Sequence, residues 1–312
     1  MAPHVMTVSG PMPPERIGFT LPHEHTSCSP ELAPTRSEPF DYEADFELMV
    51  SELRDFRRRG GSCVVDLSSE GLGRDPIRLR TLSSSTNLFI VMGTGWYRES
   101  FYPPGADIDR RSADELAAHI VAEVRDGVDG SGVRPGIIGE IGTDRAWLSP
   151  REERVHRAVA RAARQTGLAI VTHSLRSRIG LDQLALFEAE GADPGRVLVG
   201  HADSVLDLDY HLAVVERGAS LGFDLLGRPG EYEVAREARL VQIILELIER
   251  GFADRILLSQ DTSTTAQLRA FGGPGFSYVA QHFLPTLRTA AVGEGEIHQM
   301  TVENPRRLLT LP

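Results

Sequence analysis

Short apolar segments rich in β-branched residues recur along the chain, and each is followed by a longer segment whose apolar residues have helical spacing. The predicted strands are 17–21, 63–68, 88–93, 136–142, 168–174, 196–202, 219–226 and 255–261. The predicted helices lie near 43–59, 76–86, 112–126, 150–166, 178–190, 207–217, 233–250 and 278–291. Alternating strands and helices indicate parallel strands joined by crossovers, so eight such units predict a single α/β domain over residues 1–312, a (β/α)8 TIM barrel.

Two of the predicted helices carry clear end signals. The helix at 150–166 follows Ser149, a residue type that caps helix N-termini, and stops at Gly167. The helix at 233–250 can end at Gly251 in a left-handed conformation. Its predicted buried stripe consists of Val234, Ala238, Val241, Leu245 and Ile248.

An open doubly wound sheet is the alternative fold. It is not favoured, because the first strand is not followed by a GxGxxG turn and the chain has no GxxxxGK[ST] phosphate loop. Two long loops, 26–40 and 94–109, follow the first and third strands. Long loops at the carboxyl ends of barrel strands usually build the substrate pocket, so the active site is expected at that mouth.

The composition narrows the range of partners. A formal net charge of -11 disfavours binding to nucleic acid or to an anionic membrane surface, which leaves a small molecule as the expected substrate. Cys28 and Cys63 are too few for a disulfide framework or a structural zinc site and are expected to be free thiols. The chain shows neither a signal peptide nor an apolar run of about 20 residues, so we expect a cytoplasmic protein.

Polar residues occupy the carboxyl ends of the predicted strands, which meet at one mouth of a barrel. They are His23, His25, Asp66, Glu140, His173, His201 and Asp261. Imidazole nitrogens and carboxylate oxygens are the ligands that Zn²⁺ and related ions prefer. His23 and His25 are two residues apart, so they point to the same side of their strand. Glu140 lies in an apolar strand and needs a compensating charge, which a position between two metal ions would provide.

Single members of this set have ordinary alternatives. A lone histidine at a strand end is more often a hydrogen-bonded structural residue than a ligand. Asp66 is better explained as a hydrogen-bond partner of a ligand, or as a cap of its strand, than as a ligand itself. The co-occurrence of HxH, Glu, His, His and Asp on five strands is what predicts a metal site.

At this point the sequence resembles the phosphotriesterase-related branch of the amidohydrolase superfamily. The matching segments are GFTLPHEH, VVDLSSEGLGRDP, VMGTGWYRESFYP, GIIGEIGTD, THS, VLVGHAD, GFDLLGR, ILLSQD, GGPGFSYV and ENPRRLL. The resemblance implies two divalent ions, usually Zn²⁺, with Mn²⁺, Co²⁺ or Fe²⁺ as alternatives. Relatives are often dimers, so a homodimer is also an expectation.

The resemblance also implies a division of the ligands. His23, His25 and Asp261 would hold the buried ion, and His173 and His201 the more exposed ion. Many relatives bridge the two ions with a carbamylated lysine. Here that position is Glu140, which is similar to the subset of relatives that bridge with glutamate directly.

The expected activity is hydrolysis of an ester-type bond, in a lactone, carboxylic ester or phosphoester. A hydroxide between the two ions would attack, and Asp261 would accept its proton and pass it to the leaving group. Asp203 could orient the imidazole of His201 or relay protons, and a cap of its loop is the alternative. Two alternatives remain: an amidase that acts on an N-acyl compound with the same centre, and a non-catalytic metal-binding protein on the same fold.

Three further residues are candidates for substrate binding. Tyr97 lies in the loop after the third strand, where the resemblance places a tyrosine that faces the substrate; structural packing is the alternative. Arg74 and Arg228 could bind an anionic group of the substrate, and for both the alternative is a surface salt bridge.

Overall fold

The computed structural model describes residues 2–26, 46–228 and 233–312, with the backbone alone described at residues 233 and 234. The predicted burial of the Val234 side chain therefore lies outside the described part. Cys28, most of the loop predicted at 26–40 and the start of the helix predicted at 43–59 therefore lie outside the described residues. Cys63 is a free, buried thiol, and its burial raises its pKa to about 12. No helix of the described part is long and apolar enough to cross a membrane.

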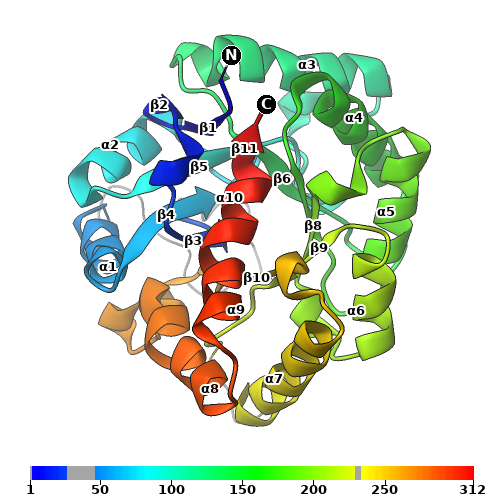
Figure 1. The fold of residues 1–312 in the computed structure, drawn as a ribbon. Helices are drawn as coiled ribbons and strands as arrows, with labels where there is room; N and C mark the ends of the chain where they lie inside the picture. Colours follow the sequence, from blue (N-terminus) through cyan, green and yellow to red (C-terminus); the bar gives the residue numbers. More distant parts are fainter. Residues whose placement is uncertain (1, 27–45, 229–232) are drawn as a thin grey trace.

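Eight parallel strands form the centre of the molecule, and the helices surround them (Figure 1). The strands are β3 (Phe19–Glu24), β4 (Gly61–Asp66), β5 (Phe89–Thr94), β6 (Ile137–Gly142), β7 (Ile170–His173), β8 (Val197–Gly200), β9 (Ser220–Phe223) and β10 (Ile256–Leu258). They follow one another around the sheet in chain order. The predicted TIM barrel is confirmed, and each strand lies where the apolar pattern predicted one.

The barrel closes between β3 and the segment that follows β10. The Asp261 N–H donates to the His23 carbonyl at 3.1 Å, and the His25 N–H donates to the Thr262 carbonyl at 3.1 Å. Glu24, between the two histidines, points to the opposite side, and its carboxylate accepts a bond of 2.8 Å from the Thr262 N–H. Burial raises the pKa of Glu24 to about 7 although several bonds oppose this shift. The backbone that carries His23 and His25 is thus fixed at the seam.

The helices include all those that the sequence predicted within the described residues. They are α1 (Phe46–Arg58), α2 (Pro76–Thr86), α3 (Ala113–Asp126), α4 (Pro150–Thr166), α5 (Gly180–Ala189), α6 (Leu208–Val215), α7 (Glu233–Glu249), α8 (Leu284–Thr289), α9 (Glu294–His298) and α10 (Asn304–Leu309). At α4 the Ser149 hydroxyl accepts from the Glu152 N–H, and Gly167 has φ 76°, as predicted. The helices α9 and α10 were not predicted.

The prediction for the buried face of α7 was partly wrong. Val241 is buried as expected, but Ala238 is exposed, and Leu245 and Ile248 are only half-buried. The fully buried residues are Leu240, Ile243, Ile244 and Leu247. The segment is apolar on more than one face, so its spacing alone did not decide which face meets the barrel. Gly251 has φ 87° and ends the helix as predicted.

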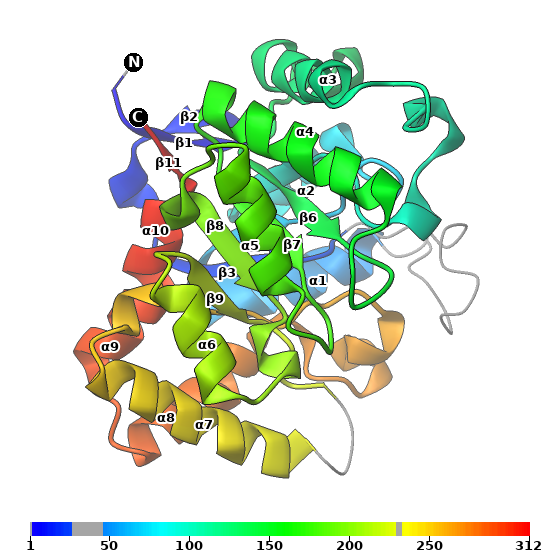
Figure 2. The same ribbon diagram turned by 90° about the vertical axis from the view of Figure 1, so that its right-hand side faces the viewer.

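A small antiparallel sheet, absent from the prediction, lies at the other end of the barrel from the carboxyl ends of the strands. It consists of β1 (His4–Thr7), β2 (Gly10–Met12) and β11 (Thr310–Leu311), in the order β11-β1-β2. The short helical turn η1 (Pro14–Arg16) leads from it to β3. Figure 2 shows this sheet beside both chain termini.

Candidate metal centre

Six predicted ligand candidates come together at the carboxyl ends of five strands. His23 lies in β3 and His25 one residue beyond it, Glu140 in β6, His173 at the end of β7, His201 directly after β8, and Asp261 after β10. All six are buried, and Asp261 is the most exposed of them at 6%. The barrel thus gathers in one place side chains that are up to 238 residues apart in the chain, as the strand-end pattern predicted.

Glu140 occupies the middle of the cluster. Its Oε1 atom lies 2.5 Å from Nδ1 of His173, 2.8 Å from Nε2 of His201 and 3.4 Å from Nε2 of His23. Its Oε2 atom lies 3.7 Å from Nε2 of His25. The Glu140 carboxylate therefore lies near four imidazoles, two at the end of β3 and two at the ends of β7 and β8. Burial would raise the pKa of Glu140, but these imidazoles outweigh burial and hold the pKa well below its usual value.

Asp261 lies beside the HxH pair. Its Oδ1 atom is 3.3 Å from Nε2 of His25 and 3.9 Å from Nε2 of His23. Its Oδ2 atom accepts a hydrogen bond from Arg228, whose side chain is about one-third exposed. Burial alone would raise the pKa of Asp261, but Arg228 and the neighbouring imidazoles hold it well below the usual range, so this carboxylate is an acceptor.

Asp224, directly after β9, completes the cluster and was missed by the sequence reasoning. Its Oδ2 atom lies 2.7 Å from Nδ1 of His23, and its Oδ1 atom lies 2.7 Å from Nδ1 of His201. A carboxylate that accepts from Nδ1 fixes the ring so that Nε2 carries the lone pair. The signal was present in the sequence, because Asp224 follows the apolar strand SLGF as the other candidates follow theirs.

Asp66, the last residue of the neighbouring strand β4, and Ser68, two residues beyond it, support His25 of the HxH pair. The Ser68 hydroxyl lies 3.2 Å from Nδ1 of His25. Asp66 accepts from the N–H of Thr26 at 2.6 Å and from the N–H of Ser68 at 2.9 Å. Asp66 therefore positions Thr26, which follows His25 in the chain, and Ser68, which contacts the His25 ring, in agreement with its interpretation as a supporting residue.

Asp203 supports the end of β9. It accepts from the backbone N–H groups of Asp224 at 3.4 Å and Leu225 at 3.0 Å. Burial and the nearby Asp224 carboxylate raise its pKa to about 6. Among the described residues Asp224, and not Asp203, contacts Nδ1 of His201. Asp203 instead holds the backbone at Asp224, the residue that orients this ring.

Two of the candidates lie on turns with left-handed backbone geometry. His201 has φ 55° and Asp261 has φ 47°. The strands before them, β8 and β10, end at Gly200 and Leu258, earlier than the apolar pattern predicted. Side-chain bearing residues rarely adopt this geometry, and where they do it costs on the order of 1–3 kcal/mol. The surrounding bonds hold both residues there, which is typical of backbone that positions a functional group.

The cluster has the charge and the donor atoms that divalent cations require. Glu140, Asp224 and Asp261 are all buried, and the permanent cation that contacts this group within the part of the chain that the structure describes is Arg228, at Asp261. Nε2 of His23 is buried without a hydrogen-bond partner among the described residues and faces Glu140. The two carboxylates beside His23 outweigh its burial and raise its pKa to about 10, which is how a cation-deficient site behaves. The residues therefore fit bound metal ions.

The three substrate candidates lie in different surroundings. The Tyr97 hydroxyl is 3.3 Å from the ring nitrogens of His173, at the edge of the cluster. Arg228 contacts Asp261. Arg74 instead forms a bidentate ion pair with Glu123 of α3, in which its two terminal nitrogens donate to the two carboxylate oxygens at 2.9 and 2.6 Å. The Arg74 side chain is only 4% exposed. This is a buried ion pair away from the histidine cluster, neither a surface salt bridge nor a contact with the site.

An eight-stranded parallel barrel with imidazoles and carboxylates gathered at its carboxyl mouth defines a metal-dependent hydrolase of the TIM-barrel class. The model of the phosphotriesterase family matches residues 3–309, and the chain belongs to this family. The chain contains no lysine, all 33 of its basic residues being arginine, so a carbamylated lysine cannot occur here.

Curated and solved relatives span nearly the whole chain. It is 34% identical over 288 residues to the phosphotriesterase homology protein of Escherichia coli, covering 92% of this chain and 96% of the relative. It is 30% identical to the N-acetyltaurine hydrolase of Dictyostelium discoideum, covering 86% of this chain and 74% of the relative. The crystal structure of a lactonase from Listeria monocytogenes superposes with a TM-score of 0.88 at 28% identity, covering 99% of both chains.

Proposed function

We propose that this hydrolase uses two divalent ions, with zinc as the expected metal, to cleave an ester-type bond in a lactone, carboxylic ester or phosphoester. The observation that carries the proposal is the shared position of Glu140. Its carboxylate forms one potential ligand group with His23 and His25 and another with His173 and His201, and within each group the donor atoms lie within 4.8 Å of one another. A carboxylate common to two groups of ligands suits a bridge between two ions.

The chain's own residues divide into two sets around this bridge. His23, His25 and Asp261 would hold one ion, and His173 and His201 the other, with Glu140 between them. Asp224 fixes one imidazole of each set through Nδ1. When bound, divalent ions supply Lewis acidity and lower the pKa of coordinated water. Asp224 would therefore orient the Nε2 lone pair of His23 in one set and of His201 in the other.

Asp261 is proposed to receive the proton of the attacking water and to deliver it to the leaving group. Its carboxylate is kept ionised by Arg228, so it is ready to accept. Arg228 holds the acceptor in place and balances its charge. Tyr97, with its hydroxyl at the edge of the cluster beside His173, is proposed to contact the substrate oxygen that develops negative charge.

The substrate class is argued from the solved and curated relatives. The likeness to a lactonase over 99% of both chains supports an ester-type bond. The N-acetyltaurine hydrolase relatives support a second candidate, an amidase that acts on an N-acyl compound. The two differ in chemistry at the leaving group, because an amide nitrogen must be protonated before it can depart, whereas an alkoxide needs less assistance.

The test is a substrate screen with the metal-loaded protein. Lactones, aryl esters, phosphotriesters, N-acyl amino acids and N-acetyltaurine are compared by kcat/KM, with Asp261→Asn as the inactive variant and Asp209→Asn, an exposed acid on α6, as the matched control. The proposal predicts the highest kcat/KM on an ester-type substrate and a loss of about 10²-fold or more in Asp261→Asn. A highest kcat/KM on N-acyl compounds would replace it with the amidase.

A further inference from the structure

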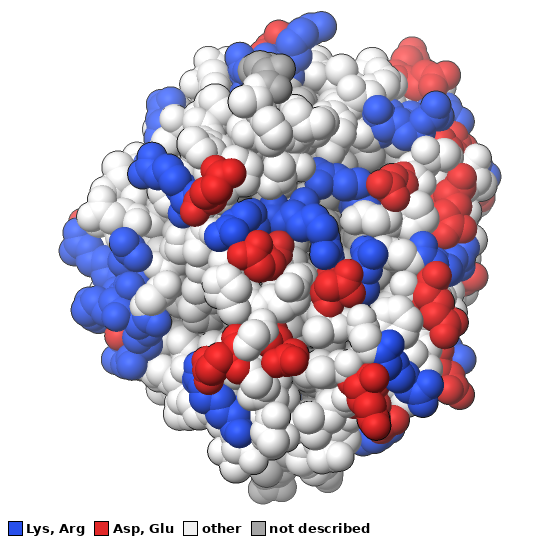
Figure 3. Space-filling view, in the orientation of Figure 1, with Lys and Arg blue, Asp and Glu red and all other residues white. Residues whose placement is uncertain are grey.

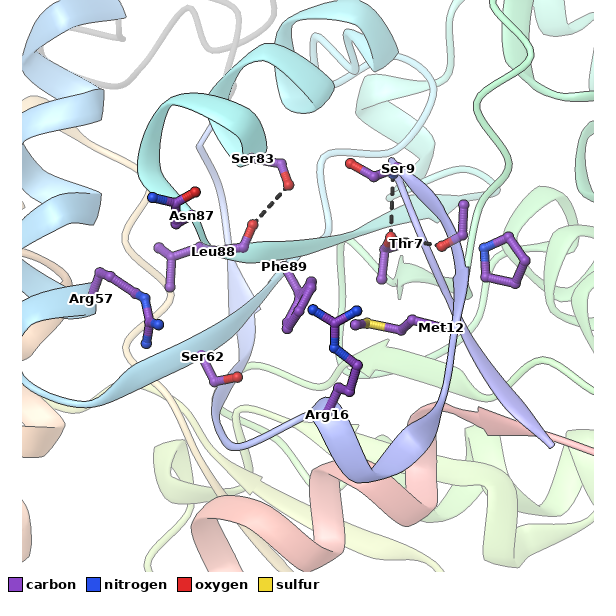
Figure 4. Close-up of a pocket in the computed structure, with 12 residues that line it drawn as sticks. Thr7, Ser9, Met12, Arg16, Arg57, Ser62, Ser83, Asn87, Leu88 and Phe89 are labelled. Carbon is purple, nitrogen blue, oxygen red and sulfur yellow. Dashed lines mark hydrogen bonds between the residues drawn. The ribbon is translucent and has the colours of Figure 1, made fainter.

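A cavity lies at the opposite end of the barrel from the histidine cluster. It has a volume of about 580 Å³ and lies between the β1–β2 hairpin, the turn η1, the end of α1 and the first residues of β4 and β5. Figure 4 shows the side chains that line it. A volume of this size accommodates a small metabolite. None of the residues proposed for catalysis lines it.

Two arginines give this cavity a positive charge. Arg57 enters from the last turn of α1 and Arg16 from η1, and Ser62 and Phe89 lie between them in the view of Figure 4. None of the described residues that line the cavity is an aspartate or a glutamate. Basic side chains are also visible over α1 in Figure 3, where the small sheet faces the viewer. The chain has a net charge of -11, so a cavity whose charged lining residues are both arginines is a local exception.

Both guanidinium groups have donors left for a ligand. Within the described ranges neither arginine forms an ion pair with a carboxylate, and the arginines beside Arg57 that do pair with one are Arg58 and Arg59, both with Asp55. Arg16 stacks its charged group over the ring of Phe89, 5.3 Å from the centroid, and a group that is stacked by its face keeps the N–H groups of its edge available. Arg57 uses one N–H on the Gly61 carbonyl at 2.9 Å and so is held at the wall of the cavity.

Neutral donors accompany the two cations. The Ser62 hydroxyl accepts from the Gly18 N–H at 3.0 Å, which leaves its own hydrogen to donate. Ser9 and Asn87 also line the cavity, and Asn87 is the residue at which α2 ends, with φ 55°. Two guanidinium edges, hydroxyls and an amide offer more donors than the two oxygens of a carboxylate can use. They suit the oxygens of a phosphate group.

We propose that this cavity is a binding site for the phosphate group of a small phosphorylated metabolite, separate from the catalytic centre. The ligand would contact the β1–β2 hairpin, η1 and the barrel strands at once. Binding to the native protein therefore stabilises the attachment of the N-terminal segment to the base of the barrel. The inference does not depend on the proposed reaction, because no catalytic candidate contributes to it.

Hydrogen–deuterium exchange of the full, metal-loaded chain tests the proposal, because it reports where a ligand binds. The probes are inorganic phosphate, glycerol phosphate and acetate. We expect both phosphates to slow exchange in peptides that cover residues 4–16 and 83–92, with acetate giving no protection there. Phosphate bound at the histidine cluster would protect other peptides, around residues 170–174 and 200–204, and is thereby distinguished.

Variants connect the protection to the two arginines. Arg16→Gln and Arg57→Gln should each weaken glycerol phosphate binding about tenfold or more, since each removes charge-assisted bonds. The control Arg250→Gln, at an exposed position after α7, should leave binding unchanged. All three should keep the activity of the parent and a similar Tm without ligand. Equal protection by acetate, or protection that survives in the Arg16→Gln, Arg57→Gln double variant, would overturn the proposal.

Discussion

The carboxylate of Asp224 lies 2.7 Å from Nδ1 of His23, and this contact decides which nitrogen His23 presents to Glu140. The other oxygen of Asp224 makes the same contact, also at 2.7 Å, with Nδ1 of His201. One carboxylate thus sets the ring orientation on β3 and after β8. Asp224 therefore contacts one histidine from each of the two proposed ligand sets.

Replacing Asp224 should therefore weaken metal binding without unfolding the barrel. In Asp224→Asn the amide still fills the space, but its NH₂ group faces an Nδ1–H that needs an acceptor. We expect metal affinity to fall about 10- to 100-fold, as for other residues that orient a ligand. Competition with a chromogenic chelator measures the affinity, and Asp209→Asn is the exposed control. Unchanged affinity would show that the two imidazoles need no such support.

Arg74 is predicted to act on stability and not on substrate binding. Arg74→Gln leaves the Glu123 carboxylate buried without its two-pronged partner, and breaking a buried pair in this way costs about 3 kcal/mol of the free energy of unfolding. KM should stay unchanged. Urea unfolding and steady-state kinetics measure the two quantities, with the exposed Arg80→Gln as the control. A raised KM with unchanged stability would restore Arg74 as a substrate contact.

His119 of α3 should make stability depend on pH. Its Nε2 atom lies 3.4 Å from Glu123 and 3.2 Å from Glu70, and these carboxylates raise its pKa to about 9 from an ordinary 6.5. Because the folded state favours protonated His119, the ion pairs contribute their full stabilisation below pH 6.5. This contribution to the free energy of unfolding is lost as the pH rises through about 9. The side chain is 35% exposed, so solvent screening reduces the effect to about 1 kcal/mol.

The comparison of wild type with His119→Gln checks this prediction. Urea unfolding at pH 6 should show the variant to be less stable by that amount, and the difference should disappear near pH 10. Glu123 adds a separate limit at low pH, because Arg74, His119 and Thr94 outweigh its burial and lower its pKa to about 2. A difference that is the same at both pH values would contradict the ion-pair explanation.

The barrel and the six ligand candidates could be predicted because strand burial and strand ends leave a local trace in the sequence. An apolar run followed by a histidine or an acid is visible residue by residue, as in VLVGH before Ala202. Asp224 follows the apolar run SLGF in the same way, so its place at the site could also have been predicted from the sequence. Because all strands of a parallel barrel run in the same direction, the residues at their carboxyl ends meet at one mouth of the barrel.

Other features could not be predicted because they depend on contacts between distant segments. The β1–β2–β11 sheet pairs residues near both ends of the chain, and strands this short carry little pattern of their own. Arg74 gave no sign of its partner, since Glu123 lies 49 residues away on a helix. The buried face of α7 was ambiguous because its apolar residues surround much of the helix.

Metal analysis of the purified protein after reconstitution with zinc or manganese tests the central claim most directly. The account predicts two equivalents of divalent ion per chain, a fall to about one in His173→Asn, and a loss of both in Glu140→Ala, since Glu140 belongs to both ligand groups. Less than one equivalent in the reconstituted parent protein would contradict the two-ion centre, whatever activity the preparation shows.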